Sequence, residues 1–358
     1  MNAARKQPRR RARAAAVLAL AAALTGCAEK DRGMNPAAPE DFSAALSTYA
    51  HEVVVPTYED LAAKASALHA AIQAYSADFT SQAMLDDAAA AWIAAREPWE
   101  KSEAFLFGPA AYLSIDPSVD SWPVDRQQLN SVLASGFALT PQFIAQGLGP
   151  ALRGFHTVEY LLFRDGAPRS AGDVTARERE YLIACSQVLA DDAALLRDEW
   201  VGHYAAKLAA AGTAGSPYAT QADALLEILD GMGGICDEVA NGKIADPYDQ
   251  QNVELEESQF SYNSLLDFQN NIRSVENAYR GGYTASNAAS VAALVRERNA
   301  ALDARLQGEI AAAVAAIAAI PSPFHDNLDK SAEIEAAQQA ILRIQVTLDG
   351  EIKPLLLR

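Results

Sequence analysis

Residues 175–200 have the sequence TAREREYLIACSQVLADDAALLRDEW, which is the clearest helical pattern in the chain. Thr175 and Glu178 have the spacing of a capping box, in which two side chains satisfy backbone N–H groups at the start of a helix. Apolar residues then recur on one face of that helix, at Leu182, Leu189, Leu196 and Trp200. This segment therefore predicts a long amphipathic helix that buries one face against other helices.

The same helical spacing recurs on both sides of this segment. We predict further helices at 41–72 with a kink at Pro56, and at 81–107, 150–165, 219–241, 258–280, 286–320 and 330–352. Residues 109–125 contain three prolines and no helical period, so we expect a loop or short turns there. Ala-rich composition with few β-branched runs agrees with this pattern. The sequence therefore predicts an all-α fold.

The stretch 209–217, AAAGTAGSP, is the best linker candidate in the chain. It separates two halves of about four helices each, and a helix can bury its apolar stripe only against other elements. We therefore expect two helical-bundle domains packed side by side, at 41–212 and 213–358.

The N-terminal residues have the pattern of an export signal. Residues 1–13 contain six basic residues and no acidic one, and a short apolar run follows that ends in Leu-Thr-Gly before Cys27. This ending resembles the bacterial lipobox, in which the cysteine is acylated and anchors the mature protein. The alternative is an ordinary cleaved signal with an incidental cysteine. We expect a lipoprotein with a tether at 27–40, located in the periplasm, and Ala28 favours the outer membrane over the inner membrane.

The formal charge of −17 excludes a nucleic-acid partner and suits cations, because 46 acidic residues face 29 basic ones. Besides Cys27, only Cys185 and Cys236 remain. They could form a disulfide in an oxidising compartment or remain two buried thiols. Neither belongs to a metal or redox motif.

Only one histidine has an acidic partner at a useful spacing. His156 and Glu159 are three residues apart on a predicted helix, so both side chains project from one face. An imidazole and a carboxylate placed in this way can bind one metal ion, zinc or iron in preference to calcium or magnesium. Gly154 would let another backbone or a ligand approach closely. The alternative is an ordinary pair on a helix surface, since this spacing also occurs by chance.

A second acidic pair, Glu100 and Glu103, has the same spacing within the aromatic stretch 99–108, WEKSEAFLFG. Carboxylate pairs and His/Glu pairs on facing helices are the ligands of carboxylate-rich iron sites in helical bundles. Alternatively, these glutamates could form solvated ion pairs with Arg96 and Lys101.

Several separated motifs occur in one order along the chain. They are WEKSEAFLFG at 99–108, SWPVD at 121–125, GFHTVE at 154–159 and SYNSLLDFQNNIRSVENAYRGG at 261–282. Together they resemble the imelysin family of exported bacterial proteins. The resemblance implies an all-helical fold of two bundle domains with the GxHxxE motif near their interface, and a link to iron uptake.

The resemblance also implies a set of site residues. His156 and Glu159 would be the central metal ligands, joined by Glu100, Glu103 and Asp125. The same cleft would be lined by Gly154, Asp267, Asn270, Asn271 and Asn277. Family members often have His-Asn where this chain has Tyr262-Asn263.

Three functions remain open at this point. The first is binding of a metal cation, iron above zinc, or of an iron chelate, in cooperation with an outer-membrane or inner-membrane iron transporter. The second is a zinc metallopeptidase that uses HxxE, as the family was first catalogued. That chemistry requires a third ligand, His203 or His325, and a general base. The third is an envelope lipoprotein that binds a ligand or partner without metal. We favour the first, because ferric iron prefers oxygen ligands and the chain is rich in carboxylates.

Overall fold

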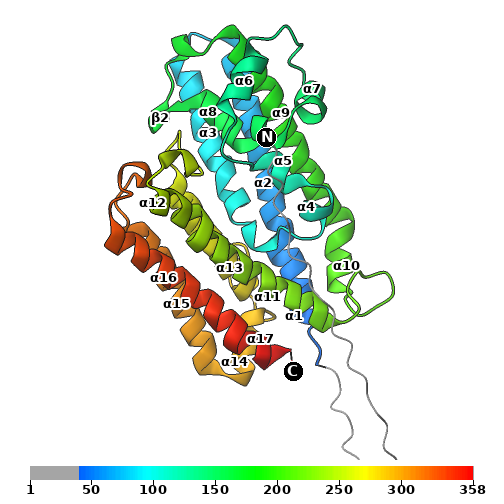
Figure 1. The fold of residues 1–358 in the computed structure, drawn as a ribbon. Coiled ribbons are helices and arrows are strands. Elements are labelled where there is room, and N and C mark those ends of the chain that lie inside the picture. The colour runs from blue at the N-terminus through cyan, green and yellow to red at the C-terminus, as the bar shows by residue number, and fades with distance from the viewer. Residues whose placement is uncertain (1–39, 358) are drawn as a thin grey trace, which may run out of the picture. The chain divides into compact units, whose positions relative to one another are not determined.

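The computed structural model describes residues 40–357, and the predicted all-α fold is confirmed there (Figure 1). Besides helices, this part contains one hairpin of two-residue strands, β1 (Phe163–Arg164) and β2 (Ala167–Pro168). Cys27, the signal peptide 1–26 and the tether up to residue 39 lie outside the described residues, so their assignments stay predictions. Within the described part, no helix is both long and apolar enough to span a membrane.

The first part of the chain forms α1 (Ser43–Thr48), η1 (Tyr49–Val54), α2 (Val55–Ala77), α3 (Gln82–Glu100), η2 (Glu103–Phe105), α4 (Pro109–Tyr112), α5 (Ile115–Val119), α6 (Arg126–Leu133), α7 (Pro141–Gly147), η3 (Pro150–Leu152), α8 (Gly154–Leu162), η4 (Ala171–Asp173), α9 (Ala176–Glu199), η5 (Trp200–Tyr204) and α10 (Ala205–Ala209). The remainder forms α11 (Gln221–Glu238), η6 (Val239–Ile244), α12 (Ala245–Gln250), η7 (Val253–Leu255), α13 (Ser264–Arg280), α14 (Val291–Arg298), α15 (Ala300–Ala319), η8 (Phe324–Asp326), α16 (Ser331–Thr347), η9 (Leu348–Ile352) and α17 (Lys353–Leu356).

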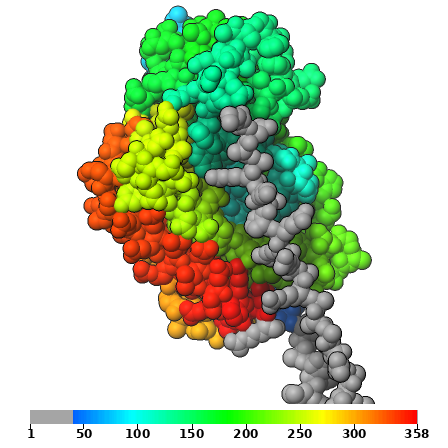
Figure 2. All heavy atoms as spheres, viewed as in Figure 1, coloured from blue at the N-terminus to red at the C-terminus, as the bar shows by residue number. Residues whose placement is uncertain are grey.

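The predicted helix at 175–200 is α9, and both hydrogen bonds of its capping box are present. Its apolar face packs on α2, which also packs on α3. The second group of long helices is α11, α13, α15 and α16, and α13 contacts α3 of the first group. The yellow residues near 250–265 lie against green and cyan residues of the first group (Figure 2). The two groups form one packed unit, and their division into two domains at 209–217 stays a prediction.

Two predicted helices are interrupted. The helix expected at 150–165 breaks at Arg153, because Gly154 has φ +80° and its Cα approaches the Val119 backbone. A Cβ on Gly154 would lie 2.4 Å from the Val119 carbonyl oxygen, so only glycine fits there without strain. The helix expected at 286–320 is divided at Asn299, whose side chain caps the start of α15.

The helix expected at 258–280 starts later, at Ser264, and residues 257–262 form turns. These turns direct backbone N–H groups of Phe260 and Ser261 toward Glu159 instead of into a helix. Residues 109–125 contain the short helices α4 and α5 between turns. Cys185 and Cys236 are both buried, and their thiols are free.

Candidate metal centre

Helix α8 carries the HxxE pair into the interior of the protein. His156 is 1% exposed and Glu159 is fully buried, so the pair is not a helix-surface ion pair. The imidazole Nδ1 lies 3.2 Å from Glu159 Oε2, as expected for residues one turn apart. One edge of the His156 ring is therefore held by a residue of the same helix.

The other oxygen of Glu159 is satisfied by a distant segment. Glu159 Oε1 accepts hydrogen bonds from Phe260 N at 3.0 Å, from Ser261 N at 2.8 Å and from Ser261 Oγ at 2.7 Å. A carboxylate with this many partners is fixed in place and has little capacity left for a metal ion. Glu159 thus orients His156 and connects α8 to the turns before α13.

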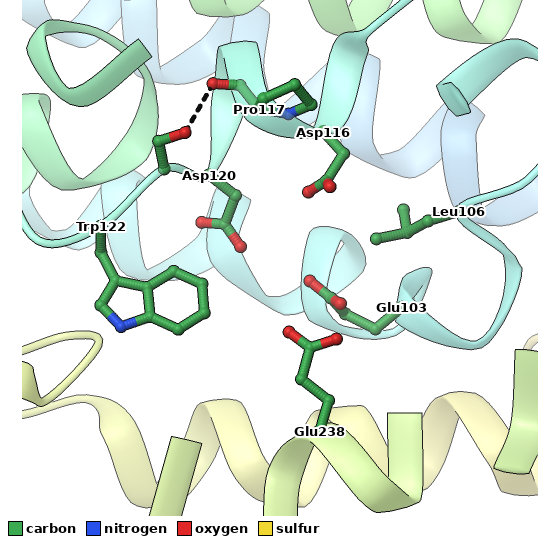
Figure 3. A pocket seen from close by; sticks show the side chains of 8 residues that line it. Glu103, Leu106, Asp116, Pro117, Asp120, Trp122 and Glu238 are labelled. Atoms are coloured by element: carbon green, nitrogen blue, oxygen red, sulfur yellow. Dashed lines mark hydrogen bonds between the residues drawn. The ribbon is translucent and has the colours of Figure 1, made fainter. Parts of the chain in front are cut away.

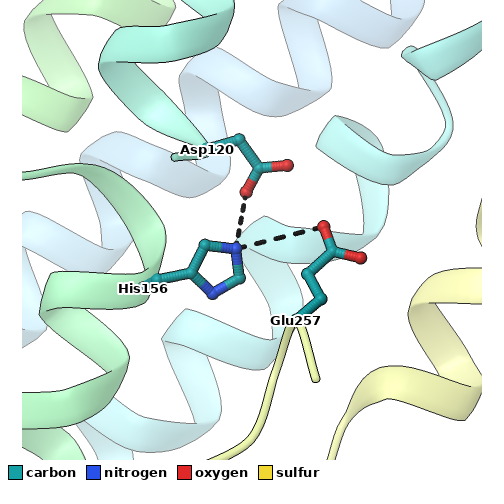
Figure 4. Close-up of side chains that lie close together, drawn as sticks. All are labelled: Asp120, His156 and Glu257. Atoms are coloured by element: carbon teal, nitrogen blue, oxygen red, sulfur yellow. Dashed lines mark ion pairs between the residues drawn. The ribbon is translucent and has the colours of Figure 1, made fainter. Parts of the chain in front are cut away.

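The free edge of the His156 ring faces two acidic residues (Figure 4). His156 Nε2 lies 3.1 Å from Asp120 Oδ1 and 4.0 Å from Glu257 Oε1. The three side chains are buried, and one ligand atom from each lies within 4.8 Å of the others. His156 Nε2 is paired with Asp120, whereas Glu257 Oε2 is buried without any hydrogen-bond partner. A metal ion bound to Nε2 would take the place of the imidazole proton that faces Asp120.

A second group of potential ligands shares Asp120 with the first. It consists of Glu100, Glu103 and Asp120, all buried. Glu100 is the last residue of α3, whereas Glu103 lies in the following turn η2, so the two do not share one helix face as predicted. Figure 3 shows the carboxylates of Glu103, Asp116 and Glu238 pointing toward one another across a pocket. The pocket has a volume of about 210 Å³, and Asp120 and Trp122 also line it.

Two buried cations neutralise part of this negative charge. The Arg96 guanidinium contacts Glu100 and Asp120 and lies 3.1 Å from Glu257 Oε1. The Lys243 ammonium lies 3.0 Å from Glu257 Oε1. The expected ion pair of Glu100 with Arg96 therefore exists, but it is buried instead of solvated. Lys101 pairs with Glu97 instead.

Burial and charge shift the pKa values of these groups in different directions. Burial alone would lower the pKa of His156, but hydrogen bonding to Asp120 and Glu159 outweighs it and raises that pKa to about 9. Burial would raise the pKa of Asp120, but the charge of Arg96 outweighs it and holds that pKa well below its usual value. For Glu100 and Glu103 burial dominates, and their pKa values lie well above the usual range.

Comparison with known proteins identifies the family of this chain. The sequence profile of the Imelysin family matches residues 54–349. The chain belongs to the imelysin family. It is 32% identical over 319 residues to iron-regulated protein A of Synechococcus elongatus, covering 87% of this chain and 85% of that protein.

Solved structures of imelysin relatives have the same fold. A crystal structure assigned as an iron-regulated protein A precursor from Parabacteroides distasonis has a TM-score of 0.83 and 34% identity, covering 90% of this chain and 97% of that one. An imelysin-like protein from Psychrobacter arcticum has a TM-score of 0.72 over 88% and 95% of the two chains, and at 17% identity it supports the fold alone.

Of the other residues predicted for the site of this imelysin chain, some adjoin the centre and others lie away from it. Asn271 donates a hydrogen bond to Glu100 Oε2 at 2.5 Å, and Asp267 Oδ1 lies 3.7 Å from Arg96 Nε, so both adjoin the centre. Asn270 accepts a hydrogen bond from Arg273, and Asn277 lines a separate pocket on α13. The structure does not bring Asp125 to the cluster, because its side chain caps α6 through Gln128 N.

Asp120 and Glu257 are ligand candidates that the sequence did not reveal. Asp120 directly precedes the SWPVD motif, which was a usable signal, whereas Glu257 lies in an acidic stretch, 254–257, without any motif. The histidines considered as third zinc ligands lie in neither group of potential ligands. His203 is exposed beside Glu199, and His325 pairs with Glu256 at 2.9 Å. Within residues 40–357, the cluster around Asp120 therefore has one imidazole.

Proposed function

We propose that this imelysin-family protein binds one iron ion between Asp120, His156 and Glu257, as an exported lipoprotein that takes part in iron uptake. The observation that carries the proposal is the buried cluster itself, in which Asp120, His156 and Glu257 each place one ligand atom within 4.8 Å of the others.

The contacts around His156 support a metal-ligand role. In metal sites, a ligating histidine usually donates its other ring N–H to a carboxylate, which fixes the tautomer and makes the imidazole a better ligand. Glu159 has this position at Nδ1, so Nε2, which faces Asp120, is the nitrogen that would bind the metal ion. Oε1 of Glu257, which lies 4.0 Å from His156 Nε2, also contacts Arg96 and Lys243, so a metal ion here would share this carboxylate with two cationic side chains.

The donor chemistry supports iron over softer or larger cations. Two carboxylates and one imidazole, with further carboxylates beside them, suit a hard cation such as ferric iron. The name of the Synechococcus relative, iron-regulated protein A, also supports iron as the bound metal. Zinc is the competing ion, since it also accepts imidazole and carboxylate ligands.

The remaining parts of the proposal concern location and domain structure. The lipobox-like residues before Cys27 support a lipid anchor that holds the protein in the periplasm, on the outer membrane. A transporter in one of the two membranes would then exchange iron with it. The linker-like composition of 209–217 supports two bundle domains.

The test is a melting series with ferric, ferrous and zinc ions on the parent protein, His156→Ala and the control His203→Ala. Because the unfolded chain has no assembled site, a ligand at 100 times its Kd stabilises the fold by about 2.7 kcal/mol. We expect iron to stabilise the parent and the control, but not His156→Ala. Equal stabilisation of all three proteins by iron would refute the site.

A further inference from the structure

Lys243 is a buried lysine whose ammonium lies inside the carboxylate cluster. It is 1% exposed and belongs to the π-helical turn η6, between α11 and α12. Its Nζ lies 3.0 Å from Glu257 Oε1, and 3.7 Å from both Glu100 Oε2 and Glu103 Oε1. Lysine is almost never fully buried unless it is paired, so this position needs a specific reason.

The three partners of Lys243 connect the two groups of potential metal ligands. Glu257 belongs to the group with His156, whereas Glu100 and Glu103 belong to the second group, and Asp120 is common to both. Two cation positions that share one carboxylate are the arrangement of a two-metal centre. In this chain the Lys243 ammonium lies 3.7 Å from both Glu100 and Glu103, the two carboxylates that belong to the second group only.

An aromatic ring further fixes the ammonium. Lys243 Nζ lies 5.4 Å from the ring centroid of Trp122, within the range of a cation–π interaction. The same indole lies beside the His156 ring, with centroids 6.1 Å apart. The Lys243 ammonium therefore lies beside Trp122 and Glu103, two residues that line the pocket.

We propose that the Lys243 ammonium is a built-in cation that takes the place of a second metal ion beside Glu100 and Glu103, and so limits the centre to one metal ion. The inference rests on the proposed function and adds that the centre binds no more than one metal ion. A second metal ion bound between Glu100 and Glu103 would need the position that the ammonium holds, and like charges repel strongly in a buried site, so the two exclude each other. Without either cation, Glu100 and Glu103 would be buried carboxylates with too little compensating charge.

The experiment counts ferrous ions bound per chain under anaerobic conditions, by titration calorimetry and by metal analysis after desalting. Lys243→Gln removes the charge, whereas Lys243→Arg keeps it. Lys64→Gln is the matched control, because Lys64 also bridges two carboxylates, Asp60 at 2.9 Å and Glu97 at 3.4 Å, but at the surface. We expect one ion in the parent, in Lys243→Arg and in Lys64→Gln, and two ions in Lys243→Gln.

Double variants assign each ion to its position. In the Lys243→Gln background, Glu103→Gln should remove the second ion only, and His156→Ala should remove the first only. If Lys243→Gln is unfolded without metal, ferrous ion should restore its helical circular dichroism, because the ion replaces the lost charge. One ion in folded Lys243→Gln, or no recovery of helix at saturating metal, would overturn the inference.

The same experiment separates this inference from the proposed function. A parent that binds one ion, with one ion also in Lys243→Gln, would leave the proposed function intact and refute the role of Lys243. A parent that binds none, with one Glu103-dependent ion in Lys243→Gln, would support the role of Lys243 and refute the proposed site at His156. No ion in any variant would refute both.

Discussion

Glu159 accepts two hydrogen bonds from Ser261, at 2.8 Å from the backbone nitrogen and 2.7 Å from the hydroxyl oxygen. The two residues are 102 positions apart in the chain. The other oxygen of the same carboxylate fixes the His156 ring at Nδ1. The glutamate of the HxxE motif therefore links the position of the candidate ligand to the packing of the later half of the chain.

This arrangement predicts that Glu159→Gln weakens metal binding without removing a ligand. A glutamine amide can donate to Nδ1, which would move the imidazole proton to Nε2 and block the metal-facing nitrogen. Loss of such an orienting partner typically costs about 10–100-fold in metal affinity.

Calorimetric titration of Glu159→Gln, His156→Ala and the control Glu199→Gln measures this effect. Glu199 is also a glutamate beside a histidine, but on the surface. His156→Ala should lose more affinity than Glu159→Gln, and the control should match the parent. An unchanged affinity in Glu159→Gln would contradict the orienting role.

The raised pKa of His156 predicts that metal affinity increases with pH well above the ordinary imidazole range. With a pKa of about 9, the ring is protonated at neutral pH, and a metal ion must displace that proton. Affinity should therefore rise by up to about tenfold per pH unit from 6 to 8. Zinc titrations across this range, with His203→Ala as control, measure the slope. A flat response above pH 7 would mean that His156 keeps an ordinary pKa.

Gly154→Ala should destabilise the fold strongly. The residue has φ +80°, and a new Cβ would lie 2.4 Å from the Val119 carbonyl oxygen. Together, strain and clash should cost at least about 2 kcal/mol in the free energy of unfolding. Gly234→Ala is the control, because it lies within α11 with open space around it and should be neutral or stabilising. Urea unfolding of the two variants compares them, and equal stability would show that the Gly154 backbone can relax.

Cys27→Ser tests the lipid anchor. We expect the parent to fractionate with membranes and the variant to appear as a soluble or an unprocessed protein, because serine cannot receive the thioether-linked lipid. Salt-washed membrane fractions and immunoblotting distinguish these forms. If the variant remained in the membrane fraction like the parent, the lipobox assignment would be wrong.

Local patterns predicted the helices well, because the spacing of apolar residues and the caps are local properties. The capping box of α9 and the shared face of His156 and Glu159 are both present. The break at Asn299 has a local cap that the spacing of apolar residues alone did not reveal. The break at Gly154 results from the approach of Val119, which is distant in sequence.

The candidate site was only partly predictable for the same reason. Asp120 follows a short helix and directly precedes the SWPVD motif, and Glu257 lies in a turn, so no helical period links either residue to His156. Arg96 was considered only as a possible partner of the glutamates in solvated ion pairs, and Lys243 belongs to none of the motifs. Their burial follows from the carboxylates that converge on them, and that convergence exists only in three dimensions.

The most direct test of the central claim is the metal content of protein purified from its own cell envelope without added metal or chelator. Mass spectrometry of all transition metals should be done on the parent, His156→Ala and His203→Ala side by side. We predict one iron per chain in the parent and in His203→Ala, and none above background in His156→Ala. Equal iron in all three proteins, or a parent without bound metal, would contradict the account.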